Sequence, residues 1–251
     1  GLSETETQKI INQLTLIPAS PLYEGNRAAF WLVNGGFDLQ RDDLSKVALH
    51  IDYIDFDHPE NNIFKVVNQY SVQGERLRRP DLLVFINGIP VAIFEFKSAI
   101  NEDANAHDAW EQITIRYTRD IPKLMKYCFL SVISDGANTK MGSIFTPYPY
   151  YYAWNKANEQ DKVSNGVSSL FTMIEGAFAK ERLLRCAILC FIQTIARKAR
   201  LLFAVIPSFS EPTKCWKILS GISGQKEMVK VARILVQRDA AKLILCYFCR
   251  G

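Results

Sequence analysis

Three charged residues interrupt two otherwise apolar runs of the sequence. Asp81 opens the first run of RPDLLVFINGIPVAIFEFKSAI (79–100), and Glu95 and Lys97 lie near the end of the second. Two carboxylates supply hard oxygen ligands for Mg²⁺ or Mn²⁺, and the Phe96 carbonyl can add a third. A bound divalent ion polarises a phosphate and lowers the pKa of a bound water, while a lysine stabilises charge that builds on the phosphate. These residue types therefore suit hydrolysis of a phosphodiester bond.

A plainer interpretation fits the same residues, because acids and lysines at strand ends commonly form a solvated edge or an ion pair. Three observations favour a site. Charge without a role inside apolar strands costs desolvation free energy. Pro80 fixes the backbone just before Asp81. The segment that follows the hairpin carries Gln112 and Tyr117, which are polar and within reach of the same strand end.

The turn between the two runs decides whether the three charges share a face. A two-residue turn at the Asn-Gly pair would place Asp81 opposite Phe94, on the face away from the other two charges. A three-residue turn, with Gly88 left-handed in a bulge, pairs Phe85 with Ile89 and brings Asp81 to the shared face. A shared site therefore requires the three-residue turn, and we predict it.

The remaining periodicity predicts a mixed α/β domain. We expect helices over residues 4–15, 26–35 and 101–121, and strands over 46–54, 63–73 and 127–134 besides the hairpin. These elements form a mixed sheet with flanking helices, which we assign to one domain over residues 1–165. Residues 166–185 are expected to form a helical linker, and residues 186–251 a tail of different composition.

Composition is that of a soluble globular protein, with 48% hydrophobic and 22% charged residues among 251. No apolar run reaches membrane-spanning length, and the N-terminus lacks the basic-then-apolar pattern of a signal peptide. We therefore expect a cytoplasmic protein that has no membrane partner.

The same region resembles a known family. Pro80-Asp81 followed by Glu95-x-Lys97 is similar to the PD-(D/E)xK nuclease motif. Over residues 18–181 the chain resembles the N-terminal region of the restriction (R) subunit of type I restriction enzymes. Three stretches carry the resemblance, namely GERLRRPDLLVFINGIPVAIFEFKSA, DAWEQITIRYTRDIPKL and SVISDGANTKMGS. The resemblance implies a restriction-endonuclease-like nuclease core. It also implies cleavage of double-stranded DNA in a complex with modification and specificity subunits, where the nuclease domain precedes an ATP-driven motor.

The resemblance assigns roles residue by residue. Asp81 and Glu95 match the metal-binding acids, and Lys97 matches the motif lysine. Gln112 and Tyr117 resemble the family's Gln-x-x-x-Tyr element, although the spacing here is one residue longer. In an α-helix the fifth residue on is turned about 100° from the fourth. Arg116, four residues after Gln112, is therefore an alternative partner on the same face.

Further residues near the hairpin are candidates for DNA contact. Arg76, Arg78 and Arg79 precede Asp81 and can hold phosphate, as Arg116 can, although a solvated loop explains the arginines before Asp81 equally well. The family's fold often adds an acid from the first helix, for which Glu4, Glu6 and Glu24 are the candidates.

Two functions of different classes follow from these residues. The first is a Mg²⁺-dependent DNA endonuclease domain of a type I restriction R subunit. The alternative is a catalytically inactive remnant that acts as a DNA- or subunit-binding module. The chain contains no G-x-x-x-x-G-K-[ST] phosphate loop, so ATP is expected only in the full-length family and not in this chain.

The tail differs sharply from the rest of the chain. Residues 1–181 carry 17 Lys/Arg and 23 Asp/Glu, a net charge of −6, whereas residues 182–251 carry 13 and 3, a net charge of +10. Five of the six cysteines lie in the second stretch. We interpret residues after about Arg185 as a shifted-frame translation of a gene that continued into the motor.

The genetic code gives this hypothesis a test. The third base of each codon, joined to the first two of the next, can spell Gly-Ala-Thr-Gly-Cys-Gly-Lys-Thr across residues 235–243, which is a phosphate loop. We expect the nucleotide sequence of codons 182–251 to spell that loop in the shifted frame. Third bases that do not spell it would end the hypothesis.

Overall fold

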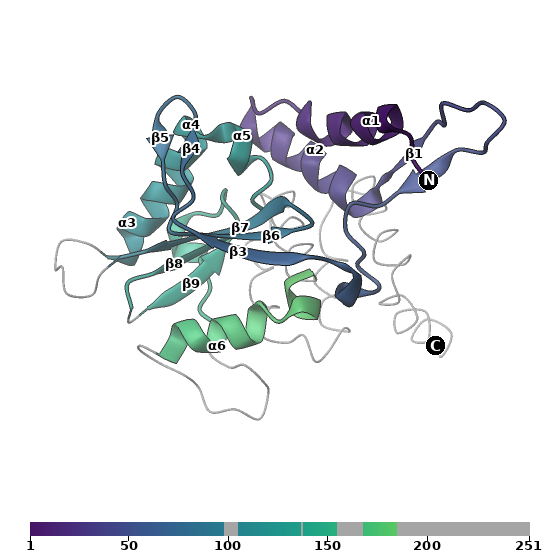
Figure 1. Ribbon diagram of the computed structural model, residues 1–251. Helices are drawn as coiled ribbons and strands as arrows, with labels where there is room; N and C mark the ends of the chain where they lie inside the picture. Colours follow the sequence, from purple (N-terminus) through teal and green to yellow (C-terminus); the bar gives the residue numbers. More distant parts are fainter. Residues whose placement is uncertain (98–104, 137, 155–167, 185–251) are drawn as a thin grey trace, which may run out of the picture.

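The computed structural model describes residues 1–97, 105–136, 138–154 and 168–184, and shows an α/β fold around a mixed five-stranded sheet (Figure 1). The strand order is β3-β6-β7-β8-β9, in which β7 and β8 run parallel and the other neighbours antiparallel. The strands are β3 (Phe64–Asn68), β6 (Leu82–Ile86), β7 (Ile89–Phe96), β8 (Leu130–Ser134) and β9 (Thr139–Gly142). The predicted mixed sheet with flanking helices is confirmed.

Helices cover both faces of this sheet (Figure 1). The α-helices are α1 (Glu4–Thr15), α2 (Leu22–Gly35), α3 (Ala106–Glu111), α4 (Thr118–Asp120), α5 (Pro122–Met125) and α6 (Ser168–Ala177). A π-helical segment, η2 (Gln112–Tyr117), joins α3 to α4, and two 3-10 turns are η1 (Pro59–Asn61) and η3 (Tyr148–Tyr150). No described helix is long and apolar enough to cross a membrane.

Two apolar cores sandwich the sheet because the side chains of its strands alternate between faces. Phe94 packs with Phe30 of α2 and Met173 of α6 in one core. Ile93, its neighbour in β7, packs with Ile113 of η2 in the other. The helix that carries Gln112 and Tyr117 thus lies on the same face of β7 as Ile93, and therefore as Glu95 and Lys97.

The first helix begins where its sequence predicts. The Ser3 hydroxyl accepts a hydrogen bond from the Glu6 amide at 3.1 Å, and the Glu6 carboxylate accepts one from the Ser3 amide at 2.9 Å. This reciprocal capping box satisfies amides that have no partner inside the helix. The helix predicted over residues 4–15 is confirmed, whereas the one predicted from residue 26 begins earlier, at Leu22.

Two predicted strands are shorter than expected. The strand predicted over 63–73 breaks at Gln69, whose φ is +53°. Its parts fall in different sheets, because β4 (Val72–Gln73) pairs only with β5 (Leu77–Arg78). The strand predicted over 46–54 is reduced to β2 (Leu49–Ile51), which pairs with β1 (Phe37–Leu39) in a separate two-stranded sheet.

The predicted domain boundaries fall partly beyond the described residues. The linker expected over 166–185 overlaps α6, whose Met173 and Ala177 are buried in the core beneath the sheet. The tail predicted over 186–251 lies outside the described residues, so its organisation stays a prediction.

Candidate active site

The central hairpin brings Asp81 beside Glu95, but by a different route from the one predicted. Its turn has two residues, and both have positive φ, 50° at Asn87 and 83° at Gly88. Ile86 therefore pairs with Ile89, and the predicted pairing of Phe85 with Ile89 is wrong. The positive φ predicted for Gly88 is confirmed.

A β-bulge in β7 supplies the extra residue that was expected in the turn. Phe85 pairs with Pro90 but Val84 with Ala92, so Val91 is the added residue. Beyond the bulge Leu82 pairs with Phe94. Continuing this register by one residue sets Asp81 opposite Glu95, on the same face.

Asp81 is fixed by donors from two different segments of the chain. One carboxylate oxygen accepts a hydrogen bond from the Phe96 amide at 2.8 Å, and the other accepts one from the Gln69 side-chain amide at 3.0 Å. In an extended strand the N–H and C=O of one residue point to the same side. The Phe96 carbonyl, which was predicted as a metal ligand, is therefore directed toward the side of Asp81.

Glu95 is a buried carboxylate, with only 2% of its surface exposed. One of its oxygens accepts a hydrogen bond from the Tyr117 hydroxyl at 2.9 Å, and the other accepts bonds from Lys97 at 3.2 Å and from the Gln112 amide. Burial, and next the negative charge of Asp81, raise the pKa of Glu95 to about 7, although Lys97 and Tyr117 oppose the shift. The site therefore holds two mutually repelling acids.

The π-helical segment resolves the unusual Gln112–Tyr117 spacing. An α-helix would turn the two side chains apart, but the π-helix bonds residues five apart and so brings them to one face. The Gln112 amide donates to the Tyr117 hydroxyl at 2.7 Å. Arg116 is exposed instead, so the alternative that placed it on the face of Gln112 is wrong. Burial and the nearby Glu95 raise the pKa of Tyr117, which keeps its hydroxyl protonated.

Lys97 completes the group of side chains around Glu95. Its ammonium donates to the Gln112 side-chain oxygen at 2.6 Å as well as to Glu95. Its own amide bonds to the Ser134 carbonyl at 2.8 Å, which holds the residue in the sheet beyond the end of β7. The structure thus brings together five predicted site residues, namely Asp81, Glu95, Lys97, Gln112 and Tyr117.

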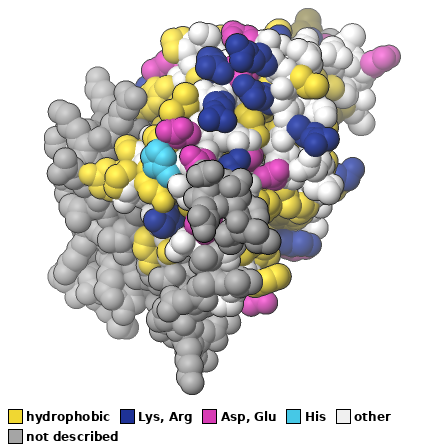
Figure 2. Space-filling model, turned by 90° about the vertical axis from the view of Figure 1, so that its left-hand side faces the viewer, with side chains coloured by type: hydrophobic (Ala, Val, Ile, Leu, Met, Phe, Trp, Pro, Cys, Tyr) yellow, Lys and Arg dark blue, Asp and Glu magenta, His cyan; other side chains and the backbone are white. Residues whose placement is uncertain are grey.

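The predicted arginines divide into two kinds. Arg78 donates to the buried Asp120 carboxylate at 2.7 Å, so its guanidinium already binds an acid. Arg76, Arg79 and Arg116 are exposed. Figure 2 shows the side of the molecule where β4, β5 and α3 lie, and Lys and Arg side chains gather over part of it. Exposed guanidinium groups are suited to contact phosphate.

Sequence reasoning missed one residue of the site and left another open. Gln69 bonds to Asp81 through its side chain, but it was counted as part of a continuous strand. Its signal was the polar pair Asn68-Gln69 in the middle of the predicted strand. Glu6, one of three candidate acids near the N-terminus, is paired with Arg41 at 2.8 Å instead.

The residues present fit a magnesium-type ion. Among the described residues no group of three or more His, Cys, Asp or Glu side chains could hold a metal. Mg²⁺ does not require one, since it is commonly bound by one or two carboxylates and completes its shell with waters and substrate phosphates. Asp81, Glu95 and the Phe96 carbonyl provide such a set of oxygens.

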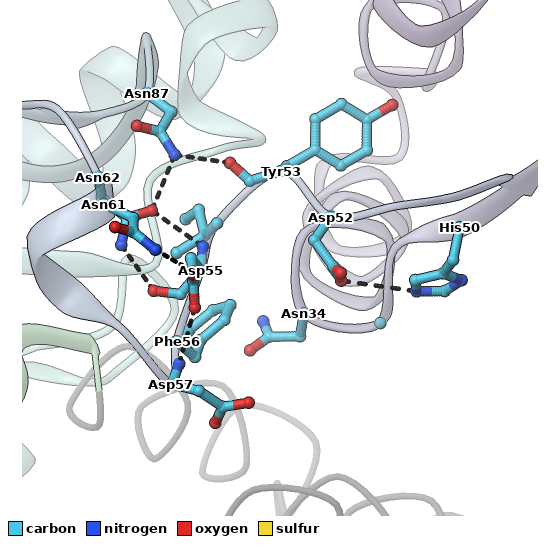
Figure 3. Close-up of a pocket in the computed structure, with 12 residues that line it drawn as sticks. Asn34, His50, Asp52, Tyr53, Asp55, Phe56, Asp57, Asn61, Asn62 and Asn87 are labelled. Atoms are coloured by element: carbon cyan, nitrogen blue, oxygen red, sulfur yellow. Dashed lines mark hydrogen bonds and ion pairs between the residues drawn. The ribbon is translucent and has the colours of Figure 1, made fainter.

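A separate pocket of about 570 Å³ lies beside the turn of the hairpin, at the other end of β7 from Glu95 (Figure 3). Three acids, Asp52, Asp55 and Asp57, contribute to its lining. Asp55 accepts hydrogen bonds from the Asp57 amide at 3.1 Å and the Asn61 side chain at 2.8 Å, so it organises its own loop. An acidic lining disfavours phosphate.

Comparison with known proteins assigns this architecture to one family. A family model described as "Type I restriction enzyme R protein N terminus" matches residues 2–150. A putative type I restriction enzyme endonuclease subunit of Methanocaldococcus jannaschii is 31% identical over 204 residues, which cover 73% of this chain and 19% of that protein. The HindI endonuclease subunit of Haemophilus influenzae is 27% identical, over 64% of this chain and 16% of its own length. The chain thus spans less than a fifth of these relatives.

The buried Glu95 predicts a pH dependence of stability in metal-free buffer with EDTA. Between about pH 4.5 and about pH 7 the native state holds a proton on Glu95 that the unfolded state has released, so the free energy of unfolding falls as pH rises. We expect Glu95→Gln to remove this contribution. The difference in unfolding free energy between variant and wild type should then grow by about 3 kcal/mol across the interval.

Urea unfolding at a series of pH values measures this difference. The matched control is Glu60→Gln, at an exposed glutamate far along the chain from the site, which should unfold in parallel with the wild type at every pH. Parallel profiles for Glu95→Gln as well would contradict the expectation.

Proposed function

The chain belongs to the family of type I restriction enzyme R protein N termini, and from this we propose that it is a metal-dependent DNA endonuclease domain with a PD-(D/E)xK core. One observation carries the proposal. Asp81 and the buried Glu95 lie on one face of the central hairpin. Lys97 follows Glu95 by two residues, and Glu95 and Gln112 bind its ammonium. Two like charges held side by side, one of them buried, cost free energy that a divalent cation would offset.

Each side chain of the site has a role in the proposed hydrolysis of a phosphodiester bond. Asp81, Glu95 and the Phe96 carbonyl would hold Mg²⁺ or Mn²⁺. The bound ion supplies Lewis acidity toward the phosphate and a water of lowered pKa. Lys97 places its ammonium where charge builds on the phosphate. Gln112 orients that ammonium through its side-chain oxygen, and Tyr117 orients the Glu95 carboxylate.

Substrate and partners follow from the family and from the charges around the site. The relatives are named as endonuclease subunits of type I restriction enzymes, so we propose double-stranded DNA as substrate and modification and specificity subunits as partners. Exposed Arg76, Arg79 and Arg116 would contact DNA phosphates. Residues 1–181 carry 17 Lys/Arg against 23 Asp/Glu, so this part of the chain adds little nonspecific affinity for DNA, which supports a role for partner subunits in recruitment.

Removal of either acid should abolish metal binding without unfolding the chain. We expect Asp81→Ala and Glu95→Ala to lose Mn²⁺ uptake in calorimetry, because each removes a carboxylate ligand. Asp43→Ala serves as control, since Asp43 is an exposed acid with 52% of its side-chain surface accessible. Circular dichroism in EDTA verifies that each variant is folded. Equal Mn²⁺ uptake by wild type and both site variants would refute the metal site.

Lys97 should act after metal binding. A charged lysine cannot ligate a metal, so Lys97→Ala is expected to bind Mn²⁺ but to nick supercoiled plasmid about 100-fold more slowly, as when a transition-state donor is lost. The substitution is assayed in a complex rebuilt with full-length R subunit and with modification and specificity subunits, and Lys65→Ala, at an exposed lysine of β3, is the control. Unchanged nicking by Lys97→Ala would refute its role. Metal binding without any nicking by the wild type would favour the alternative, a non-cleaving binding module.

A further inference from the structure

We infer that Gln69 is a positioning residue that orients the Asp81 carboxylate for the divalent ion. The inference rests on the proposed function, because it concerns a ligand of the proposed metal site. Gln69 lies one residue beyond the end of β3, in register with Asp81 of the neighbouring strand, since Asn68 pairs with Leu82.

Gln69 contacts Asp81 twice. Its backbone amide donates to the Asp81 carbonyl at 2.9 Å, and its side-chain amide donates to a carboxylate oxygen of Asp81 at 3.0 Å. The first contact places the backbone of Asp81 and the second sets the rotation of its carboxylate. Together with the Phe96 amide, which donates to the other oxygen at 2.8 Å, every oxygen of the Asp81 side chain has a defined donor.

These donors leave the carboxylate able to bind a cation. A carboxylate oxygen has two lone-pair sites, so one hydrogen bond on each oxygen leaves one site on each for a metal. Both donors are neutral amides, so neither brings a positive charge that would compete with the cation. Hydrogen bonds of this kind commonly orient metal-ligating carboxylates.

The backbone of Gln69 points to the same role. Its φ of +53° lies in the left-handed region, where Gly and Asn are common and Gln is not. Asn87 is the other non-glycine residue with positive φ among those described, and it occupies the hairpin turn, where Asn is expected. Position 69 carries neither Gly nor Asn, although either residue would adopt this positive φ with less backbone strain. The left-handed bend and the long amide side chain together direct Nε2 onto Asp81.

The substitution Gln69→Gly separates orientation of Asp81 from stability. Glycine accepts the positive φ without strain and removes the Gln69 side chain together with its donor. In the 251-residue chain, we expect the dissociation constant for Mn²⁺, measured by calorimetry, to rise about tenfold. The midpoint of thermal unfolding in EDTA should stay the same or rise, because strain is relieved. A purely structural role would lower that midpoint and leave metal affinity unchanged.

Two further variants complete the experiment. Gln69→Asn tolerates the left-handed backbone but shortens the amide by one methylene, so it should weaken Mn²⁺ binding in the same direction as Gln69→Gly. Gln73→Ala is the matched control, since the Gln73 side chain bonds only to the neighbouring Gly74 carbonyl in the described structure, at 3.1 Å, and it should bind Mn²⁺ as the wild type does.

The outcomes distinguish this inference from the function on which it rests. No Mn²⁺ binding by the wild type overturns the proposed metal site and the role of Gln69 with it. Binding by the wild type with equal affinity in Gln69→Gly and Gln69→Asn overturns only the role of Gln69. A tenfold loss in both variants, with unfolding midpoints at or above that of the wild type, supports it.

Discussion

The extra residue in β7, at Pro90–Val91, determines which side chains of the central hairpin share a face. Without it, the two-residue turn would set Asp81 opposite Phe94, whose ring lies in the core beside α2 and α6. An unpaired carboxylate there would be desolvated without compensation. With it, Asp81 leaves that core and meets Glu95 on the face covered by η2. The apolar core and the proposed site therefore depend on the same bulge.

The π-helical segment does for the helix what the bulge does for the strand. Each adds one residue to a regular element and so changes which side chains point together. The bulge aligns Asp81 with Glu95, and η2 aligns Gln112 with Tyr117. Both irregular elements are less favourable locally than their regular counterparts. The hydrogen bonds that Gln112 and Tyr117 make to the buried Glu95 offset that cost, because a buried carboxylate without donors would be more costly still.

The sequence was sufficient to predict the site residues and most of the helices and strands, but not the bulge or the π-helical segment. Asp81, Glu95 and Lys97 stood out because a charge within an apolar strand costs desolvation free energy. Such charges can be recognised from the residue types alone. The extra residue was predicted in the wrong place, in the turn, because the Asn-Gly turn was considered without the strand that follows it, β7. Pro90 was the available signal, since it cannot donate to a central strand and is tolerated at a bulge. The spacing from Gln112 to Tyr117 was interpreted with α-helical geometry. The π-helix is favoured by the contacts that both side chains make with Glu95, which the sequence does not show. The short pairs β1–β2 and β4–β5 carry too few residues for any periodicity to show.

Formal charge connects the proposed metal to the proposed substrate. With both acids ionised, Asp81, Glu95 and Lys97 carry a net formal charge of −1, which repels a phosphate. A divalent cation changes the sum to +1, which attracts one. At distances of a few ångströms and away from bulk water, this reversal of charge changes the electrostatic free energy of a bound phosphate by more than any single exposed arginine does. Among the described residues that line the pocket at the opposite end of β7, three are acids and none is a lysine or arginine. The proposed metal would therefore convert the end of β7 that contains Glu95 from one that repels a phosphate into one that attracts it.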